Sequence, residues 1–275
     1  MTAVEELFSL RGRVAVVTGA TGAIGSALAR GLGAAGARVA LLARRPEPLA
    51  ELAASLAADG IEAAPWSVDV RDQAGLEQAR DAIVARLGGV HILVNVAGGN
   101  VPAATVPPGG DPFSVGAEGL REVVELNLLG TMAAVAAFGP ALDAADGADR
   151  SIVNISSIAA SRAITRVGGY GAAKAAVESY TRWLAVELAR RGTGIRVNAI
   201  APGFLLGEQN RALLQHPDGT PTERGETIVA RTPAGRLGTA AELVSTVVWL
   251  CGPGASFVTG IVVPVDGGFT AFSGV

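Results

Sequence analysis

Two side chains in the second half of the chain have the types and the spacing needed for proton transfer. Tyr170 and Lys174 are four residues apart in an alanine-rich segment, so a helix places them on one face, one turn from each other. A phenol with a pKa of about 10 is a poor base at neutral pH, whereas a nearby ammonium group favours the phenolate. We therefore expect Lys174 to lower the pKa of Tyr170, which can then exchange a proton with an alcohol or a carbonyl group.

Taken alone, the Tyr-x-x-x-Lys pattern is also that of an ordinary exposed helical pair. A serine upstream favours the chemical interpretation, because Ser157 follows the apolar run 151–155 and lies thirteen residues before Tyr170. The alternative is that its hydroxyl only satisfies backbone groups at the end of a strand. The combination of Ser157, Tyr170 and Lys174 predicts a catalytic site.

A glycine-rich turn near the start of the chain has the composition of a phosphate-binding loop. The sequence Thr18-Gly-Ala-Thr-Gly-Ala-Ile-Gly25 follows the apolar run 13–18 and precedes helix-forming residues. Its glycines leave backbone amides and a helix N-terminus open to a pyrophosphate. Such turns also close tight strand–helix connections without a ligand, but the position after the first strand favours dinucleotide binding. The residues of this turn that are expected to contact the cofactor are Gly19, Thr21, Gly22, Ile24 and Gly25.

The elements that must position these groups alternate along the chain. Seven apolar runs rich in β-branched residues predict strands at 13–18, 38–42, 63–68, 91–95, 151–155, 195–200 and 261–265. The segments between them are rich in Ala and Leu at helical spacing. This alternation predicts an α/β protein with a doubly wound parallel sheet, in which ligands bind beyond the carboxyl ends of the strands.

One segment departs from the alternation of strands and helices. Residues 203–237 contain Gly, Pro and Arg and the turn signal His216-Pro-Asp-Gly219, and they are too many for an ordinary connection. We predict that they form a substrate lid. No shift in composition marks a linker, so residues 1–275 are predicted to be a single domain.

Four motifs together resemble those of the short-chain dehydrogenase/reductase family. They are the glycine turn 18–25, an Asn-x-Ala-Gly after the fourth strand, a serine before Tyr-x-x-x-Lys, and Pro-Gly after the sixth strand. The resemblance covers almost the whole chain and implies a Rossmann fold with seven parallel strands in the order 3-2-1-4-5-6-7. Ala23 replaces the family's middle glycine and Val96 its second asparagine, and neither is a proton-transfer group.

The resemblance also implies roles for individual residues. Ser157 would stabilise charge on the reacting oxygen, with Ser156 the weaker candidate, and Asn127 would hold a water molecule of a proton relay. Gly207 stands where the family usually has a threonine near the nicotinamide. A plain turn role for Asn95 is the alternative to cofactor binding. The other residues implied in cofactor binding are Asp69, Val70, Asn95, Ala97, Gly98, Tyr170, Lys174, Pro202 and Gly203.

The end of the second predicted strand bears on the choice of cofactor. An acidic side chain there usually binds the ribose 2′-hydroxyl of NAD, but this chain has Ala43 followed by Arg44 and Arg45. The planar guanidinium of arginine suits a 2′-phosphate. We therefore favour NADP(H), bound through Arg44, over NAD(H); the alternative is that both arginines are only solvated.

Further motifs resemble the D-mannonate oxidoreductase (fructuronate reductase) group within this family. They are Ala97-Gly-Gly-Asn100, Asn127-Leu-Leu-Gly-Thr131, the segment 209–214 and the ending 256–268. This resemblance implies the reversible oxidation of a sugar-acid alcohol to a keto acid. The residues expected to bind the substrate are Asn100, Ser157, Gln209, Asn210 and Arg211, with Arg211 the first choice for the carboxylate.

One alternative concerns the substrate residues and two concern the function. Residues 209–211 could form only the polar face of a lid helix, and the basic residue expected near Ala103 in this group is absent. A short-chain reductase of another sugar, a polyol or a ketoacyl group has the same fold and proton-transfer residues. A nucleotide-binding regulator without catalysis is the third, although it would not need to keep all four catalytic residues.

Composition and residue spacing disfavour other classes of protein. The net charge of −3 has no basic stripe, which argues against nucleic acid and membrane surfaces as partners. The apolar runs are shorter than the roughly 20 residues of a membrane span, and no secretory signal is visible, so a cytoplasmic location is expected. His91 and His216 lack partners at metal-ligand spacing, so no metal is expected. Cys251 is expected to pack as a small hydrophobe, and the family resemblance implies a homotetramer.

Overall fold

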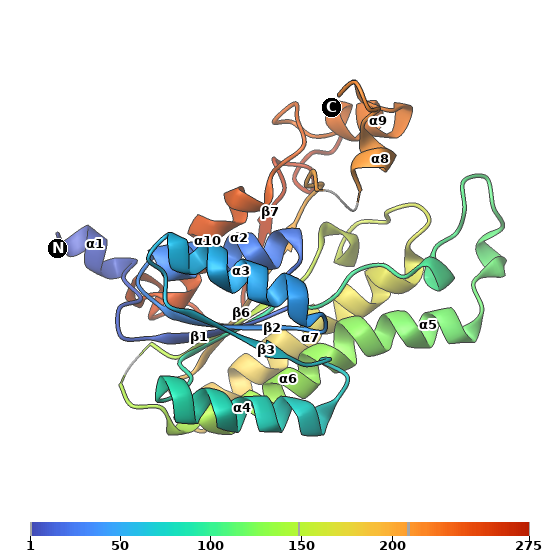
Figure 1. Ribbon diagram of the computed structural model, residues 1–275. Helices are drawn as coiled ribbons and strands as arrows, with labels where there is room; N and C mark the ends of the chain where they lie inside the picture. Colours follow the sequence, from blue (N-terminus) through green and yellow to red (C-terminus); the bar gives the residue numbers. More distant parts are fainter. Residues whose placement is uncertain (1, 148, 208–209, 275) are drawn as a thin grey trace.

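The computed structural model describes residues 2–147, 149–207 and 210–274 and consists of three layers, with a seven-stranded sheet between two layers of helices (Figure 1). All strand pairs are parallel, and the order is β3-β2-β1-β4-β5-β6-β7, as predicted. The strands are β1 (Val14–Thr18), β2 (Arg38–Ala43), β3 (Ala63–Ser67), β4 (Ile92–Asn95), β5 (Ser151–Ile155), β6 (Arg196–Pro202) and β7 (Val262–Val265).

Helices cover both faces of the sheet. One face carries α2 (Ala23–Ala34), α3 (Pro46–Ala58) and α10 (Val244–Cys251), and the other carries α4 (Gln73–Leu87), α6 (Gly130–Ala144) and α7 (Gly168–Arg190). The remaining α-helices are α1 (Ala3–Leu7), α5 (Ala117–Val124), α8 (Arg211–Leu214) and α9 (Glu223–Ala230). The short 3₁₀ segments are η1 (Pro102–Ala104), η2 (Pro112–Ser114), η4 (Ile158–Ala160), η5 (Ala240–Leu243) and η6 (Pro253–Ala255).

The alternating direction of strand side chains explains why the apolar runs are continuous. In β1, Ala15 and Val17 pack against the α2–α3–α10 layer, whereas Val14 and Val16 pack against the α4–α6–α7 layer. Each of these four residues is fully buried. Both faces of a parallel sheet must be covered, so its central strands lose the alternation of apolar and polar residues.

Helix α5 continues into α6 through a wider π-helical turn, η3 (Glu125–Leu129). The whole helix, Ala117–Ala144, is long and apolar enough to cross a membrane by length and composition alone. The uninterrupted apolar runs within it are much shorter, so the sequence did not indicate this. Its buried residues, including Val135, Phe138 and Leu142, pack in the core between α4 and the sheet. This is the pattern of a core helix in a globular domain.

Candidate active site

The predicted catalytic pair lies at the start of α7. Tyr170 and Lys174 are on one face of this helix, and the Lys174 Nζ is 5.7 Å from the centre of the Tyr170 ring. Lys174 is buried and donates a 2.7 Å hydrogen bond from Nζ to the carbonyl oxygen of Ile155. Between them, Gly171 lets the helix approach η4, because a Cβ there would lie 2.8 Å from the carbonyl oxygen of Ala159. The pair is therefore held between β5 and the segment that follows it.

The two consecutive serines after β5 point to different environments. Ser157 lines the same cleft as Tyr170 and Lys174, and its Oγ accepts a 3.2 Å hydrogen bond from the Ala159 N–H. The Ser156 hydroxyl is buried and donates a 2.9 Å hydrogen bond to Glu178 on α7. This geometry agrees with the preference for Ser157 over Ser156 that the spacing suggested.

Asn127 lies in the π-helical turn and is fully buried. Its Oδ1 accepts a hydrogen bond from the Gly99 N–H at 2.9 Å, and its Nδ2 donates to the carbonyl oxygens of Gly99 and Val123 at 2.8 Å each. The side-chain amide thus fixes the turn after β4. A Cβ on Gly98 would lie 2.7 Å from Asn127 Oδ1 and 3.1 Å from Lys174 Nζ, so these three residues meet in one small space.

Burial dominates the electrostatics of the predicted catalytic pair. It raises the pKa of Tyr170, and the adjacent Ser157 hydroxyl lowers that pKa by less. Burial also lowers the pKa of Lys174 to about 8. The net shift of the Tyr170 pKa is therefore upward, opposite to the lowering expected from Lys174, whose ammonium group donates to the Ile155 carbonyl oxygen.

These directions predict opposite pH dependences for the two directions of an alcohol–carbonyl reaction. If Tyr170 is the predicted proton-transfer group, oxidation requires its ionised form as the base, so a raised pKa makes oxidation increase with pH above neutrality. Reduction requires protonated Tyr170 as the acid, so it persists through neutral pH and falls at alkaline pH. Above about pH 8 the loss of charge on Lys174 removes support for the phenolate. Measuring kcat/KM in both directions from about pH 6 to about pH 10 tests this; a shared optimum would contradict it.

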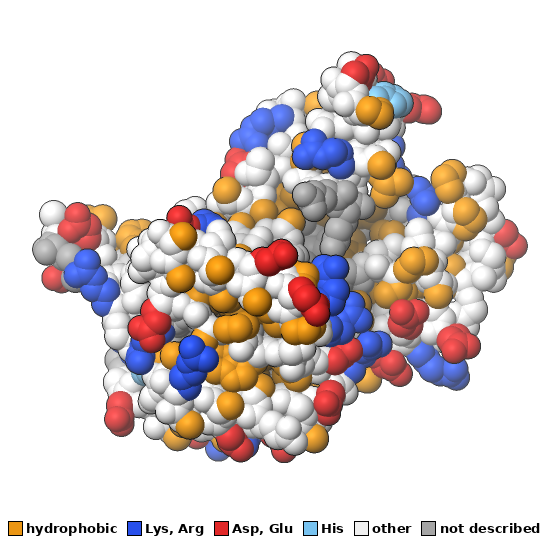
Figure 2. Space-filling view, viewed as in Figure 1, with side chains coloured by type: hydrophobic (Ala, Val, Ile, Leu, Met, Phe, Trp, Pro, Cys, Tyr) orange, Lys and Arg blue, Asp and Glu red, His pale blue; other side chains and the backbone are white. Residues whose placement is uncertain are grey.

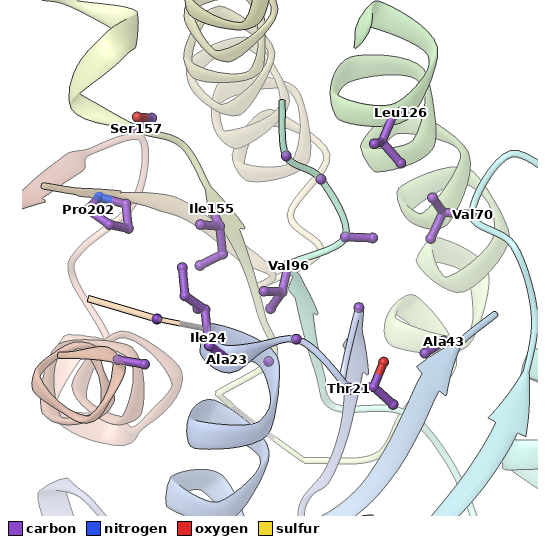
Figure 3. A pocket seen from close by; sticks show the side chains of 18 of the residues that line it. Thr21, Ala23, Ile24, Ala43, Val70, Val96, Leu126, Ile155, Ser157 and Pro202 are labelled. Carbon is purple, nitrogen blue, oxygen red and sulfur yellow. The ribbon is translucent and has the colours of Figure 1, made fainter. Parts of the chain in front are cut away.

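A cleft of about 780 Å³ opens at the carboxyl ends of the strands. Figure 2 shows this side of the molecule hollowed, with Lys or Arg side chains at its edge. In Figure 3, Ser157 and Pro202 lie at one end, Ala43, Thr21 and Val70 at the other. The predicted site residues that line the cleft are Gly19, Thr21, Gly22, Ile24, Gly25, Arg44, Asp69, Val70, Ala97, Gly98, Ser157, Tyr170, Lys174, Pro202, Gly203 and Asn210.

The glycine turn brings backbone groups to the centre of this cleft. Gly19 has a left-handed backbone, with φ of +63°, and a Cβ there would lie 2.8 Å from the backbone of Ala97. Gly22 is the N-cap of α2 without a side-chain cap, so the first amides of that helix are open to an anion. Ala23, which replaces the family's glycine, is the first helical residue and is exposed. The replacement therefore leaves the turn intact.

Comparison with known proteins agrees with this geometry. The sequence profile of a family described as enoyl-(acyl carrier protein) reductase matches residues 19–270. An oxidoreductase called UxuB from Bacillus subtilis is 42% identical over 97% of this chain and 98% of its own. The chain belongs to the short-chain dehydrogenase/reductase family. It is thus an oxidoreductase that acts on alcohol or carbonyl groups with a nicotinamide cofactor.

Two solved structures of this family are similar over nearly their whole lengths. A candidate D-mannonate oxidoreductase from Haemophilus influenzae with bound NAD is 35% identical, with a TM-score of 0.91, over 99% of this chain and 100% of that one. A gluconate 5-dehydrogenase from Burkholderia cenocepacia in complex with NADP and tartrate is 32% identical, with a TM-score of 0.86, over 98% and 99%. Both nicotinamide cofactors therefore occur among the relatives of this dehydrogenase/reductase.

The far end of the cleft from Ser157 contains one acidic residue that is already paired. Asp69 accepts hydrogen bonds from the Arg71 guanidinium, the shortest at 2.7 Å, and these lower the pKa of Asp69. Arg71 was not among the residues predicted from the sequence; it pairs with Asp69 within the loop after β3. Leu126, which reaches the cleft from the π-helical turn, was not predicted either. An interruption of a helix by a π turn leaves no residue pattern that predicts it.

Asn95 lies beneath the cleft and does not line it. It is buried, and its Nδ2 donates a 2.9 Å hydrogen bond to Asn154 on β5. Asn154 in turn donates to Thr181 on α7 at 2.9 Å. This chain of hydrogen bonds joins two strands to the catalytic helix, so the geometry supports a structural role for Asn95 rather than the predicted contact with the cofactor.

The predicted substrate residues are less closely grouped. Asn210 uses its amide to hold the segment that follows β6, with Oδ1 accepting from Gly207 N–H at 2.8 Å and Nδ2 donating to Leu205 O at 2.7 Å. Asn100 and Arg211 are exposed and do not line the cleft; Asn100 donates to Thr105. Gln209 lies outside the described residues.

The Cys251 thiol, His91 and His216 do not contribute to this cleft as the structure describes it. Cys251 is buried, and burial raises the pKa of its thiol to about 12, which suits a packed hydrophobe. The residues that the structure describes contain no group of three or more His, Cys, Asp or Glu side chains that could hold a metal ion.

Proposed function

We propose that this enzyme interconverts a secondary alcohol of a sugar acid and the corresponding keto acid, with D-mannonate and D-fructuronate as the model pair. The observation that carries the proposal is the meeting of Ser157, Tyr170 and Lys174 at one end of a cleft whose other wall is the glycine turn. Similarity to the Haemophilus candidate D-mannonate oxidoreductase supports the choice of a sugar acid. A nicotinamide cofactor bound in the cleft would supply or accept the hydride of this reaction.

The side chains of this chain would transfer the proton and stabilise the substrate oxygen. Tyr170 gives or takes the proton of the substrate oxygen, and the Ser157 hydroxyl donates a hydrogen bond to that oxygen. Lys174 supplies positive charge beside the phenol. Asn127 holds the turn that separates Lys174 from the glycine loop, and by family resemblance it belongs to the proton relay. Asn100 and Arg211 stay predictions as substrate contacts.

A panel of substrates tests the proposal directly. Sugar acids, neutral polyols and ketoacyl thioesters would be assayed with both cofactors, and we expect the highest kcat/KM for D-mannonate or D-fructuronate. A higher kcat/KM for a polyol or a ketoacyl thioester would replace this proposal with another reductase of the family. Tight cofactor binding with no turnover of any compound would indicate a nucleotide-binding regulator.

We propose NADP(H) as the preferred cofactor, with Arg44 binding its 2′-phosphate. Arg44 and Arg45 follow β2, line the cleft and are exposed, and no acidic residue ends that strand. Replacing Arg44 by alanine should lower kcat/KM for NADPH about 10- to 100-fold, because one charge-assisted hydrogen-bonding group is lost. The value for NADH should change by less than about threefold. Equal losses with both cofactors in steady-state assays would contradict the role of Arg44.

We also propose a cytoplasmic homotetramer of single-domain chains with a lid at about residues 203–237. The outer face formed by η3, α6 and α7 exposes Leu129, Met132, Trp183 and Val186, of which Trp183 is 57% exposed. Apolar side chains gathered on adjacent helices favour burial against another copy. Light scattering of the purified enzyme should give the mass of four chains, and Trp183→Glu should lower it. A monomeric wild-type enzyme would exclude the assembly.

A further inference from the structure

The loop 161–167 joins the two halves of the proton-transfer site, since Ser157 precedes it and Tyr170 follows it. Guanidinium groups connect this loop to three neighbouring segments. Arg162 donates to the carbonyl oxygen of Thr270 near the end of the chain. Arg224, on lid helix α9, donates to the Thr165 hydroxyl at 3.3 Å. In Figure 1 the loop that leads into α7 lies between the lid helices and the segment before α5.

Arg166 makes the third connection, and its backbone is strained. Its Nε donates to the carbonyl oxygen of Val106 at 2.7 Å, and the Val106 N–H donates to the Arg166 carbonyl oxygen at 2.9 Å. The φ of Arg166 is +76°, a left-handed conformation that costs free energy for any residue with a Cβ. Glycine or asparagine would adopt it more easily. An arginine held there by two hydrogen bonds suggests a use for its guanidinium group.

We call Arg162, Arg166 and Arg224 the arginine rim; the acidic residues next to it are Glu223 and Glu226, which flank Arg224 in the first turn of α9. From Arg150 to Val177 the sequence contains four basic residues and no Asp or Glu. Among the described residues, no carboxylate forms an ion pair with Arg162, Arg166 or Arg224. Arg166 and Arg224 are also half-buried. Partly desolvated cations without an anionic partner favour the binding of an anion.

We propose that Arg166 and Arg224 form the subsite for the carboxylate of the substrate, a proposal that rests on the sugar-acid function above. With Nε fixed by Val106, the two Nη groups of Arg166 remain to bind both oxygens of a carboxylate. Arg224 approaches the same rim from the lid through Thr165. In a sugar acid, several hydroxylated carbons separate the carboxylate from the reacting alcohol, which suits a subsite on the rim rather than beside Tyr170.

The same arrangement links substrate charge to the lid. Two like charges on facing segments repel each other, and an anion between them turns this repulsion into attraction. Binding of the carboxylate would therefore draw α9 towards the loop 161–167. A neutral polyol lacks this effect, so the subsite would distinguish sugar acids from their uncharged counterparts.

Matched substrates test the proposal. The kcat/KM for D-mannonate and for D-mannitol would be measured for Arg166→Asn, which keeps a residue tolerant of left-handed backbone, and for Arg224→Gln. We expect about a 30- to 100-fold loss for the acid in the first variant and about a 10-fold loss in the second, mainly through KM. The value for the polyol should change by less than about threefold. Arg166→Lys should recover part of the lost activity.

Arg190→Gln is the matched control, because Arg190 is exposed at the opposite end of α7. It should leave both substrates unaffected. Cofactor titration and the thermal midpoint report whether each variant is folded. Equal losses for the acid and the polyol in folded Arg166 variants would show a structural role and overturn the subsite. A wild-type enzyme that turns over no sugar acid would instead refute the proposed function on which the subsite depends.

Discussion

Replacing Tyr170 by phenylalanine should lower kcat by about 10³-fold and change the Kd of the cofactor by less than about threefold. The substitution removes only the hydroxyl group, and general acid–base catalysis contributes about 10²- to 10⁴-fold. The ring would still pack against Val101, Ala104 and Val123. Steady-state assays give kcat, and fluorescence titration with the reduced cofactor gives Kd.

The chain contains a matched control for this substitution. Tyr180 is the other tyrosine, and it lies further along α7 with its ring stacked on Trp183 at 5.8 Å. Tyr180→Phe should retain nearly full turnover. If Tyr170→Phe keeps more than about a tenth of the wild-type kcat, then another group transfers the proton and the assignment of Tyr170 is wrong.

Replacing Gly25 by alanine should cost about 1–3 kcal/mol of the free energy of unfolding and weaken cofactor binding severely. A Cβ at Gly25 would lie 2.2 Å from the carbonyl oxygen of Gly19 and 2.9 Å from the Cα of Ala20. Both contacts are with backbone atoms, which cannot rotate away as a side chain can. The turn would have to shift, and with it the amides at the start of α2. Urea denaturation and cofactor titration measure the two effects.

Gly22→Ala separates stability from binding within the same turn. Its Cβ would meet only the Gly19 carbonyl oxygen, at 3.4 Å, which is ordinary contact. The free energy of unfolding should therefore stay within about 0.5 kcal/mol of the wild type, while the new methyl group hinders the approach of a pyrophosphate. Loss of stability in Gly22→Ala equal to that in Gly25→Ala would show that close packing at Gly25 is not the cause.

The strands and the proximity of Tyr170 to Lys174 could be predicted because their signals are local. A parallel strand covered on both faces is an uninterrupted apolar run, as in β1. Tyr170 and Lys174 need only a regular helix to meet. The cofactor turn is equally local, because Gly19 and Gly25, which pack against each other, are only six positions apart in the sequence.

Residues whose roles depend on distant partners were harder to predict. Asn95 stands at the end of a strand, where polar residues often bind ligands, but its partner is Asn154, 59 residues away. Arg166 is bound to Val106, 60 residues away, and nothing in either local sequence indicates this. Asn127 was placed in the site only by family resemblance, since no local pattern predicts the π turn that buries it.

The close contacts around Gly19 and Gly98 have a consequence for redesigning coenzyme preference. Gly19 abuts Ala97, and the neighbouring Gly98 abuts both Asn127 and Lys174. A substitution in the phosphate turn would therefore be transmitted to the lysine beside the reacting oxygen. Arg44 and Arg45, which directly follow β2, have exposed side chains instead. Engineering that exchanges one nicotinamide coenzyme for the other should thus succeed at positions 44 and 45, where changes in specificity need not reduce turnover.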